Sequence, residues 1–502
     1  MHPVCGISEL LEIIFSNLDD QSNTSNAQVC RQWGECALNI LWYEVTDFRR
    51  LFRILVPMRK EPIGASMCYK FTRQPEVNDW RNFDRYRPRV RTRTSLNVLP
   101  NLRTLQWDAP LRSGIVFMHD NVTDLRLHPR SPELGSPCFR EIVARMPNIT
   151  HLELHPQFPM SVLVADIVKV IRSMKLLRNI TLPRETPAAG LMEAISGLHA
   201  LHTLTFPDVR SADFWSLQSM RPSLNEGAFY SLSSLSICIC FEDAIYLFNM
   251  LSAPSKLHTI RLDSPKFESL ATIHDLLVVV GKLIPSLESF ELQSVLDADG
   301  YTTRPITQNY ILDINTIRSL FKCREIVRLK FMLPHSLHLR ESDVEVVARA
   351  WPCIQRLALN SMPNHLHSCV LTLDSLIPFA RYCPDLEILA LFIRADKLDI
   401  AHSAIDSTLR WKVHSFFPGF SDIEDPGVVS LSLSRIFPLW VTIIAPCPVT
   451  SPTMLSDTLQ TMQSHCDKWK KVSEMLPLLM QARMEERNKM RRLMQSGRQV
   501  DM

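Results

Sequence analysis

The chain has 502 residues, enough for a large buried core and for about two to four domains or one extended repeat array. Hydrophobic residues make up 46% and charged residues 21%, which is typical of a folded protein and excludes a disordered one. The net charge of +3 does not by itself indicate binding to nucleic acid or membrane, and 13 glycines against 33 prolines disfavour folds that hold phosphates in glycine loops.

The first segment with a clear period is ISELLEIIFSNL, from Ile7 to Leu18, whose apolar residues recur at helical spacing. The polar stretch DDQSNTSN over 19–26 predicts a turn. Two further short amphipathic stretches follow, one through Val29 and Trp33 and one through Leu38 and Trp42. Three short helices in about forty residues bury too little apolar surface to be stable alone, so we expect this module to dock on a partner or on the rest of the chain.

Three elements of this segment, LLEIIFSNL, VCRQW and LNILWYEV, together resemble the F-box, and the following DFRRLFRILVP is similar to fungal F-box proteins. Where the family usually opens with Leu-Pro, this chain has VCGIS. The resemblance implies that residues 1–48 bind the Skp-type adaptor of a cullin–RING ubiquitin ligase. The residues that it divides between a small core and the adaptor interface are Leu10, Leu11, Ile14, Phe15, Leu18, Val29, Trp33 and Trp42. The alternative is a plain helical cap that uses the same side chains as core.

Residues 49–95 read as a helical linker with a basic stretch, RNFDRYRPRVRTRTS. Its six arginines and Tyr86 are compatible with a nucleic-acid patch. The other interpretation is a helix that ends near Pro88, with Trp80, Phe83 and Tyr86 packed at helical spacing and the arginines in water. The small net charge favours this second interpretation, so nucleic acid is not an expected partner.

From residue 96 to 440 one hexad recurs, with an apolar residue, two variable ones, and then apolar, variable, apolar. Its clear copies start at residues 102, 122, 149, 177, 201, 232, 257, 287, 326, 354 and 386, and VVSLSL at 428–433 is a weaker twelfth. Successive starts lie 20 (122 minus 102) to 42 (428 minus 386) residues apart. This period is typical of leucine-rich repeats. It predicts an α/β fold, an irregular solenoid with parallel strands on the concave face and helices outside.

The segments between hexads have helical spacing. Examples are PCFREIVARMP, IHDLLVVVGKLIP and SDVEVVARAWP, the last with Ser342 and Glu345 placed as a capping box.

In each hexad the residues on either side of the central apolar position should point away from the core. In the later repeats four of them are basic, namely Arg261, Arg328, Lys330 and Arg356. These are the candidate substrate-binding residues. A mixed polar surface of this kind suits protein recognition, and both an acidic ligand and a merely solvated face stay open.

Residues 441–502 read as a proline-rich loop, an amphipathic helix and a charged tail. Apolar residues from Leu455 to Leu479 recur at spacings of three and four, and Pro477 should kink or split the helix. This helix either caps the last repeat or binds a partner.

No nucleotide-binding, hydrolase or metalloprotease motif is present in the sequence. HLHSC, with His365, His367 and Cys369, lacks the further ligands of a metal site. We therefore expect no enzymatic activity, no cofactor and no bound metal.

Thirteen cysteines without a disulfide pattern, and an early apolar run interrupted by Glu9 and Glu12, favour an intracellular location in cytoplasm or nucleus. The uncharged run 436–456 is broken by prolines, so no membrane span is expected. The resemblance and the repeats together imply the substrate-recognition subunit of an SCF-type ubiquitin ligase. The alternative is a non-catalytic leucine-rich-repeat scaffold that does not join a ligase.

Overall fold

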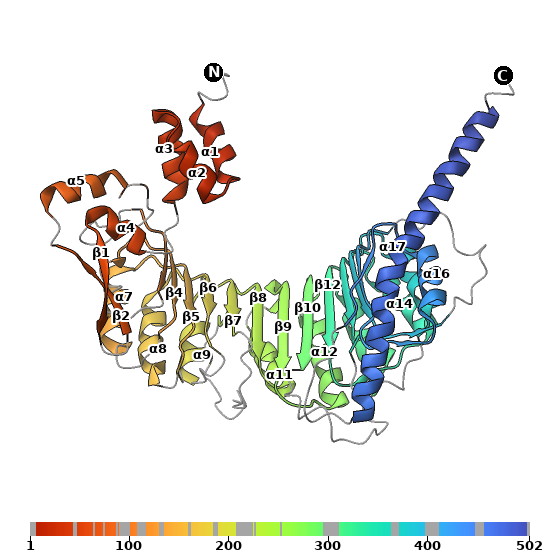
Figure 1. The fold of residues 1–502 in the computed structure, drawn as a ribbon. Helices are drawn as coiled ribbons and strands as arrows, with labels where there is room; N and C mark the ends of the chain where they lie inside the picture. The colour runs from red at the N-terminus through yellow and green to blue at the C-terminus, as the bar shows by residue number, and fades with distance from the viewer. Residues whose placement is uncertain are drawn as a thin grey trace. The chain divides into compact units, whose positions relative to one another are not determined.

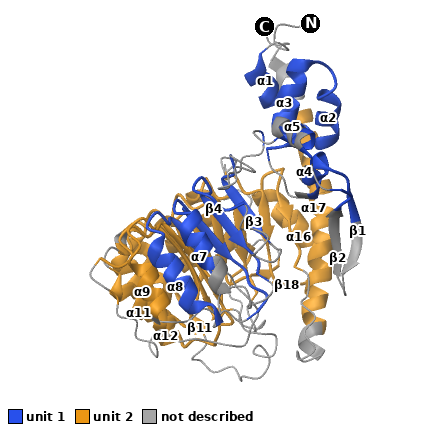
Figure 2. Cartoon of the chain, turned by 90° about the vertical axis from the view of Figure 1, so that its left-hand side faces the viewer, with its two compact units in different colours: residues 1–186 blue, residues 187–502 orange. Residues whose placement is uncertain are grey.

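The fold was analysed in a computed structural model of the chain (Figure 1). The residues that it describes are 7–43, 48–63, 66–73, 76–86, 89, 101–107, 117–129, 135–158, 162–183, 189–206, 224, 227–251, 254–294, 311–362, 371–396, 411–446 and 456–498. The chain divides into two compact units, residues 1–186 and residues 187–502, which Figure 2 distinguishes by colour.

The first unit begins with three helices, α1 (Ser8–Ser16), α2 (Asp20–Asn26) and α3 (Arg31–Leu41). The number of helices agrees with the sequence analysis, but their bounds do not. The polar stretch expected as a turn is helix α2, because the Asp19 carboxylate accepts a hydrogen bond from the Ser22 backbone N–H at 2.8 Å and caps its first turn. The two later stretches form the single helix α3.

A small core holds these three helices together. Leu11 and Phe15 of α1 pack against Cys36 and Ala37 of α3, and all four side chains are buried. Asn23 of α2 is also buried, and its side-chain amide donates to the Phe15 backbone carbonyl at 2.9 Å. The polar helix is therefore fixed to the core by a satisfied buried hydrogen bond rather than by an apolar face.

The segment expected as a helical linker contains helix α4 (Phe48–Leu55), helix α5 (Val77–Tyr86) and, between them, an antiparallel hairpin of β1 (Met58–Ile63) and β2 (Ser66–Phe71). The predicted packing of α5 is confirmed at two positions. Phe83 is fully buried, and the Tyr86 ring lies 5.3 Å from that of Trp42, between ring centroids.

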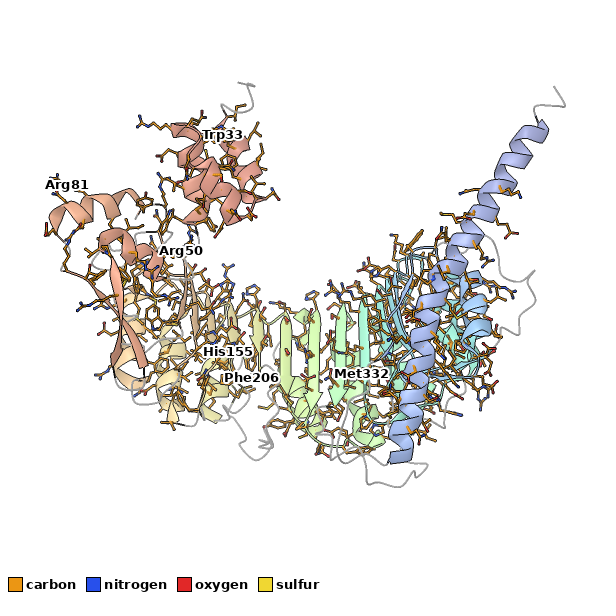
Figure 3. All side chains as sticks on the ribbon, viewed as in Figure 1. Trp33, Arg50, Arg81, His155, Phe206 and Met332 are labelled. Atoms are coloured by element: carbon orange, nitrogen blue, oxygen red, sulfur yellow. The ribbon has the colours of Figure 1, made fainter. Side chains whose placement is uncertain are left out.

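One arginine of the basic stretch departs from the expected solvated position. The Arg89 side chain is 9% exposed and donates to the Glu35 backbone carbonyl at 3.0 Å, to the Glu35 carboxylate and to Asn39. This guanidinium therefore links the linker to helix α3, whereas Arg81 is exposed (Figure 3).

Parallel strands occupy the hexads of both units, which confirms the solenoid prediction (Figure 1). In the first unit they are β3 (Thr104–Trp107), β4 (Asp124–Leu127), β5 (His151–Leu154) and β6 (Asn179–Thr181), each paired with the next. In the second unit they begin with β7 (Thr203–Thr205), β8 (Ser234–Cys238), β9 (Thr259–Ser264), β10 (Ser289–Ser294), β12 (Arg328–Met332), β14 (Arg356–Leu359) and β15 (Ile388–Leu391). In β3, β12 and β14, for example, buried residues alternate with more exposed ones, as the period of two requires.

Helices follow the strands in most repeats. The first unit has α7 (Gly135–Arg145) and α8 (Val164–Ser173). The second has α9 (Ala189–Ser196), α11 (Phe241–Met250), α12 (Leu270–Leu283), α13 (Ile314–Ile317), α14 (Glu341–Ala350), α15 (Leu376–Tyr382) and the 3₁₀ turns η5 (Pro254–Lys256), η8 (Arg318–Lys322) and η10 (Leu373–Ser375). Short parallel pairs also form between β11 (Ile311–Leu312) and β13 (Ser336–Leu337), and between β16 (Arg394–Ala395) and β18 (Asp422–Ile423).

The capping box expected at Ser342 and Glu345 is wrong. Helix α14 begins at Glu341, and the Asp343 carboxylate accepts from the Arg340 backbone N–H at 2.9 Å. The Asp343 carboxylate therefore satisfies a backbone donor at the start of the helix that has no partner within the helix. This contact makes Arg340 the N-cap, and the helix begins one residue before Ser342.

Side chains that follow two of the strands bind the backbone of the preceding repeat. The Asn360 side chain accepts from the Leu333 N–H at 2.8 Å and donates to the His335 carbonyl. The Ser421 hydroxyl accepts from the Ile393 N–H at 2.8 Å in a comparable place two repeats later. These contacts satisfy buried backbone groups at turns, where no ladder partner exists.

The weak hexad at 428–433 is not a strand, so this prediction was wrong. The segment lies in helix α16 (Pro426–Ile436), which begins where the Asp425 carboxylate accepts from the Gly427 N–H at 2.7 Å and where Pro426 fits the first turn. The ladder instead ends with β17 (Ser415–Phe417) and β19 (Thr442–Ile443), neither of which carries a leucine hexad.

Helix α17 (Ser456–Arg498) runs through Pro477 as one element, so of the two expected effects, a kink or a split, the split does not occur. Its buried side chains are Met462, Cys466, Trp469, Val472, Leu476 and Met480. The Trp469 indole N–H donates to the Ser421 carbonyl at 2.9 Å, and the helix packs on α16. Burial on both sides of Pro477 offsets the cost of about 3 kcal/mol that an interior proline carries. The apolar face of the helix therefore covers the end of the solenoid.

Candidate functional site

The N-terminal helices carry a group of exposed apolar side chains. Leu10 and Ile14 of α1 are 38% and 46% exposed, and Leu18 and Val29, in the turns on either side of α2, are 42% and 55% exposed. Exposed apolar residues in one group on a small domain are typical of a protein interface.

The other four candidates face inward. Leu11 and Phe15 are 2% exposed, and Trp33 packs its ring against Phe15 at 5.3 Å between centroids. Trp42 is half-buried beside Tyr86. Trp33 can be followed in Figure 3 among the side chains of the three helices. The structure thus divides the candidate set into an outer face and a core.

Three exposed apolar residues were not among the sequence candidates. Ile7, Ile13 and Tyr43 are 43%, 61% and 56% exposed. Ile7, Leu10 and Ile14 follow one another at spacings of three and four, and Ile13 lies three residues beyond Leu10, so α1 carries a broad outer stripe. The helical spacing of the apolar residues predicts the stripe, but it does not predict which side of the stripe is buried.

A comparison with protein families gives one match in this region. Residues 8–47 match the family model described as F-box-like. The N-terminal module is an F-box-like domain. It comprises α1, α2 and α3, and its outer stripe lies within the matched residues except for Ile7.

The comparison with curated proteins finds no match to the sequence. Among solved structures, the chain is similar to the Rad7 and Elc1 complex in yeast, with a TM-score of 0.40, 11% identity, and coverage of 68% of this chain and 82% of that one. It is also similar to the leucine-rich repeat-containing protein LegL7 from Legionella pneumophila (TM-score 0.29, 14% identity, 47% and 73% coverage). A third is the LRIM1/APL1C complex (TM-score 0.29, 11% identity, 81% and 69% coverage).

In the second unit the four basic candidates lie on the outward side of the strands. Arg328 and Arg356 are exposed, while Arg261 and Lys330 are half-buried. The Arg261 guanidinium lies 3.0 Å from the buried Asp263 carboxylate, and the Lys330 ammonium donates to the Gln293 side chain at 3.2 Å. The structure therefore gives two of these groups an internal partner.

Buried thiols of the solenoid have the environment of structural residues. Burial raises the pKa of Cys323 to about 11 and that of Cys383 to about 12. Their thiols point to backbone carbonyls, Cys323 to Ile284 at 3.3 Å and Cys383 to Ala348 at 3.4 Å. A thiol with a raised pKa holds little thiolate at neutral pH, so neither residue has the character of a nucleophile.

Within the described part of the chain no cluster of three or more His, Cys, Asp or Glu side chains is arranged to hold a metal ion. The HLHSC stretch at 365–369 lies outside the described residues. No described helix combines the length and hydropathy needed to cross a membrane.

Proposed function

We propose that this protein is the substrate-recognition subunit of an SCF-type ubiquitin ligase. The F-box-like domain binds a Skp-type adaptor and through it a cullin–RING ligase, and the solenoid binds a target protein. The chain itself performs no covalent chemistry and needs no cofactor. Its contribution to ubiquitin transfer is to hold the target near the ligase. This role places it inside the cell, in the cytoplasm or the nucleus.

The outer stripe of α1 is the observation that carries this proposal. Leu10 and Ile14 are exposed although their neighbours Leu11 and Phe15 fill the core. A helical cap over the following repeats would bury both sides of the helix. Burying one such aliphatic side chain on binding is worth about 1.5–3 kcal/mol, so a few of them supply a large part of an interface energy.

Binding of the purified full chain to a purified Skp-type adaptor tests the proposal. The test variant is Leu10→Glu with Ile14→Glu, which keeps good helix formers and removes apolar surface only from the outer stripe. We expect the adaptor affinity to fall by at least about tenfold, while the melting temperature stays unchanged.

The matched control is Val346→Glu on α14, which replaces a side chain of similar exposure, 44%, on a solenoid helix. It should bind the adaptor as the wild type does. A wild-type chain that is folded but does not bind the adaptor would instead favour the scaffold that joins no ligase. Equal binding by the stripe variant would show that α1 is not the interface.

A further inference from the structure

From β9 to β17, the outward side of the second unit's strands carries two rows of residues fixed by the parallel register. The first outward row consists of Thr259, Ser289, Arg328, Arg356, Ile388 and Ser415. The second outward row consists of Arg261, Glu291, Lys330, Ala358, Ala390 and Phe417. Members of one row lie side by side on strands about 4.8 Å apart.

Charges in the second outward row alternate in sign. Arg261 is the register partner of Glu291, and Glu291 is the register partner of Lys330. Arg261 also pairs with Asp263, and Lys330 donates to Gln293. The basic groups of this row therefore have polar or acidic neighbours within the protein.

The first outward row is different, because its two charged members have the same sign and are neighbours. Arg328 on β12 is the register partner of Arg356 on β14, and both side chains are exposed. Among the described residues neither guanidinium makes a hydrogen bond or an ion pair. Glu288 and Glu387 come one residue before this row in their repeats, and their carboxylates form no ion pair with either arginine. Like charges placed directly across a ladder destabilise a sheet, so this pair costs the free protein stability.

Apolar side chains adjoin the arginine pair on the side of the later repeats. Ile388 is the register partner of Arg356, and Phe417 lies on the strand beyond it in the second row. Both are half-buried and so retain accessible apolar surface. Met332, labelled in Figure 3, ends the strand that carries Arg328.

We propose that Arg328 and Arg356 together bind an acidic group of the target protein, a carboxylate or a phosphate, while an apolar side chain next to that group packs on Ile388 and Phe417. Two guanidinium groups side by side offer paired N–H donors that match the oxygens of either anion. An anion between them also relieves their mutual repulsion. The inference rests on the proposed function, because it names the chemistry of the target that the solenoid recognises.

Oriented peptide libraries test this on the immobilised full chain. Each library has one fixed central residue, which is Glu, phosphoserine or Gln, and degenerate flanking positions. We expect the chain to retain the Glu or the phosphoserine library at least about tenfold over the Gln library, with aliphatic or aromatic residues enriched beside the fixed position. Retention of both acidic libraries indicates a carboxylate-competent site, and retention of phosphoserine alone indicates that the target must be phosphorylated.

The test variant is Arg328→Gln with Arg356→Gln. Its matched control is Arg324→Gln with Lys282→Gln, which removes the same charge from two exposed positions, the turn before β12 and the last turn of α12. The test variant should lose the selectivity for acidic peptides and the control should keep it. Melting curves of both variants establish that each is folded.

Three results would overturn the inference. They are equal retention of the Gln and acidic libraries, equal loss in both variants, or tighter binding of a single-stranded oligonucleotide than of any acidic library. Adaptor binding is measured on the same variants. If the wild-type chain binds the adaptor but does not select acidic peptides, this inference alone is rejected. If the wild-type chain does not bind the adaptor, the proposed function is rejected.

Discussion

Phe15 and Trp33 pack edge to face in the F-box-like domain, with ring centroids 5.3 Å apart and an angle of 69° between the rings. This contact joins α1 to α3. Phe15 also accepts, through its backbone carbonyl, the hydrogen bond from the buried Asn23 amide. The ring and the backbone of one residue thus connect all three helices, and the outer stripe depends on it for its position.

We therefore predict that Phe15→Ala unfolds the F-box-like domain and leaves the solenoid folded. Truncation of a buried phenylalanine costs about 3–5 kcal/mol, which is as much as a core of this size supplies. Hydrogen exchange should show lost protection in residues 8–41 and unchanged protection in β10 and β12. Ile13→Ala, at a side chain that is 61% exposed, is the control and should keep protection in both regions. Retained protection in the Phe15→Ala helices would contradict the assigned core.

The repulsion between Arg328 and Arg356 predicts that removing one of them stabilises the free protein. Arg328→Gln should raise the free energy of unfolding by about 0.2–1 kcal/mol, which is the range for a cross-strand pair. Lys330→Gln should not raise it, because Lys330 donates to Gln293 and faces Glu291 in register. Urea denaturation of the two variants measures the difference. A destabilised Arg328→Gln protein would mean that the arginine has a stabilising role in the fold.

Among the glycines that the structure describes, Gly419 is the one whose substitution should cost most. Its φ is +57°, and a Cβ there would lie 1.7 Å from the Ser361 carbonyl oxygen. Gly419→Ala should lower the free energy of unfolding by more than the roughly 1–2 kcal/mol of a left-handed residue, because the backbone must also move. Gly190→Ala on α9 is the opposite case, since nothing lies within 4 Å of a Cβ placed there, and it should raise the free energy of unfolding by up to about 1 kcal/mol. Thermal melting of both variants checks the order, and a neutral Gly419→Ala would contradict the close approach to Ser361.

His335 makes the second unit less stable in acid. It is fully buried against Phe267, and burial lowers the pKa of its imidazole from 6.5 to about 4. Between these values the unfolded chain binds a proton and the folded chain does not, so the free energy of unfolding falls as the pH drops from 6.5 towards 4. Above pH 6.5 the imidazole is neutral in both states and the effect is absent.

The size of the effect follows from the shift, about 3 kcal/mol near pH 4. The His335→Phe protein keeps a planar ring that does not titrate. Its free energy of unfolding should therefore fall less than that of the wild type as the pH drops from 6.5 to 4. The neighbouring Glu268 has a raised pKa because it is buried, which gives the opposite slope, but it is present in both proteins and cancels in the comparison. Parallel loss of stability in the two proteins would contradict the assignment.

The repeats could be predicted from the sequence because each clear hexad alternates apolar residues with the period of a strand. The hexad pattern does not form a strand at 428–433, because Asp425 and Pro426 start a helix there and the segment also fits a helical stripe through Val429, Leu433 and Ile436. Strands β17 and β19 could not be predicted from the hexad, because their few residues carry no leucine pattern.

The candidate site could be predicted only in part, for a geometric reason. The helical period places Leu10, Leu11, Ile14 and Phe15 on one broad stripe, but it does not say which half faces α3. Helix α2 was missed because its sequence is polar, and its stability comes from the Asp19 cap and the buried Asn23 amide. In the solenoid, the sequence identified four basic residues, and only the register shows that two of them are neighbours without an acidic partner in their row.

The claim on which the rest depends is that the F-box-like domain joins this chain to a ubiquitin ligase. The most direct measurement is affinity capture of the tagged full chain from cells, beside the chain that lacks residues 1–48, with the bound proteins identified by mass spectrometry. We predict that a Skp-type adaptor and a cullin accompany the full chain and are lost with residues 1–48. Their absence from the folded full chain, or their retention without residues 1–48, would contradict the account.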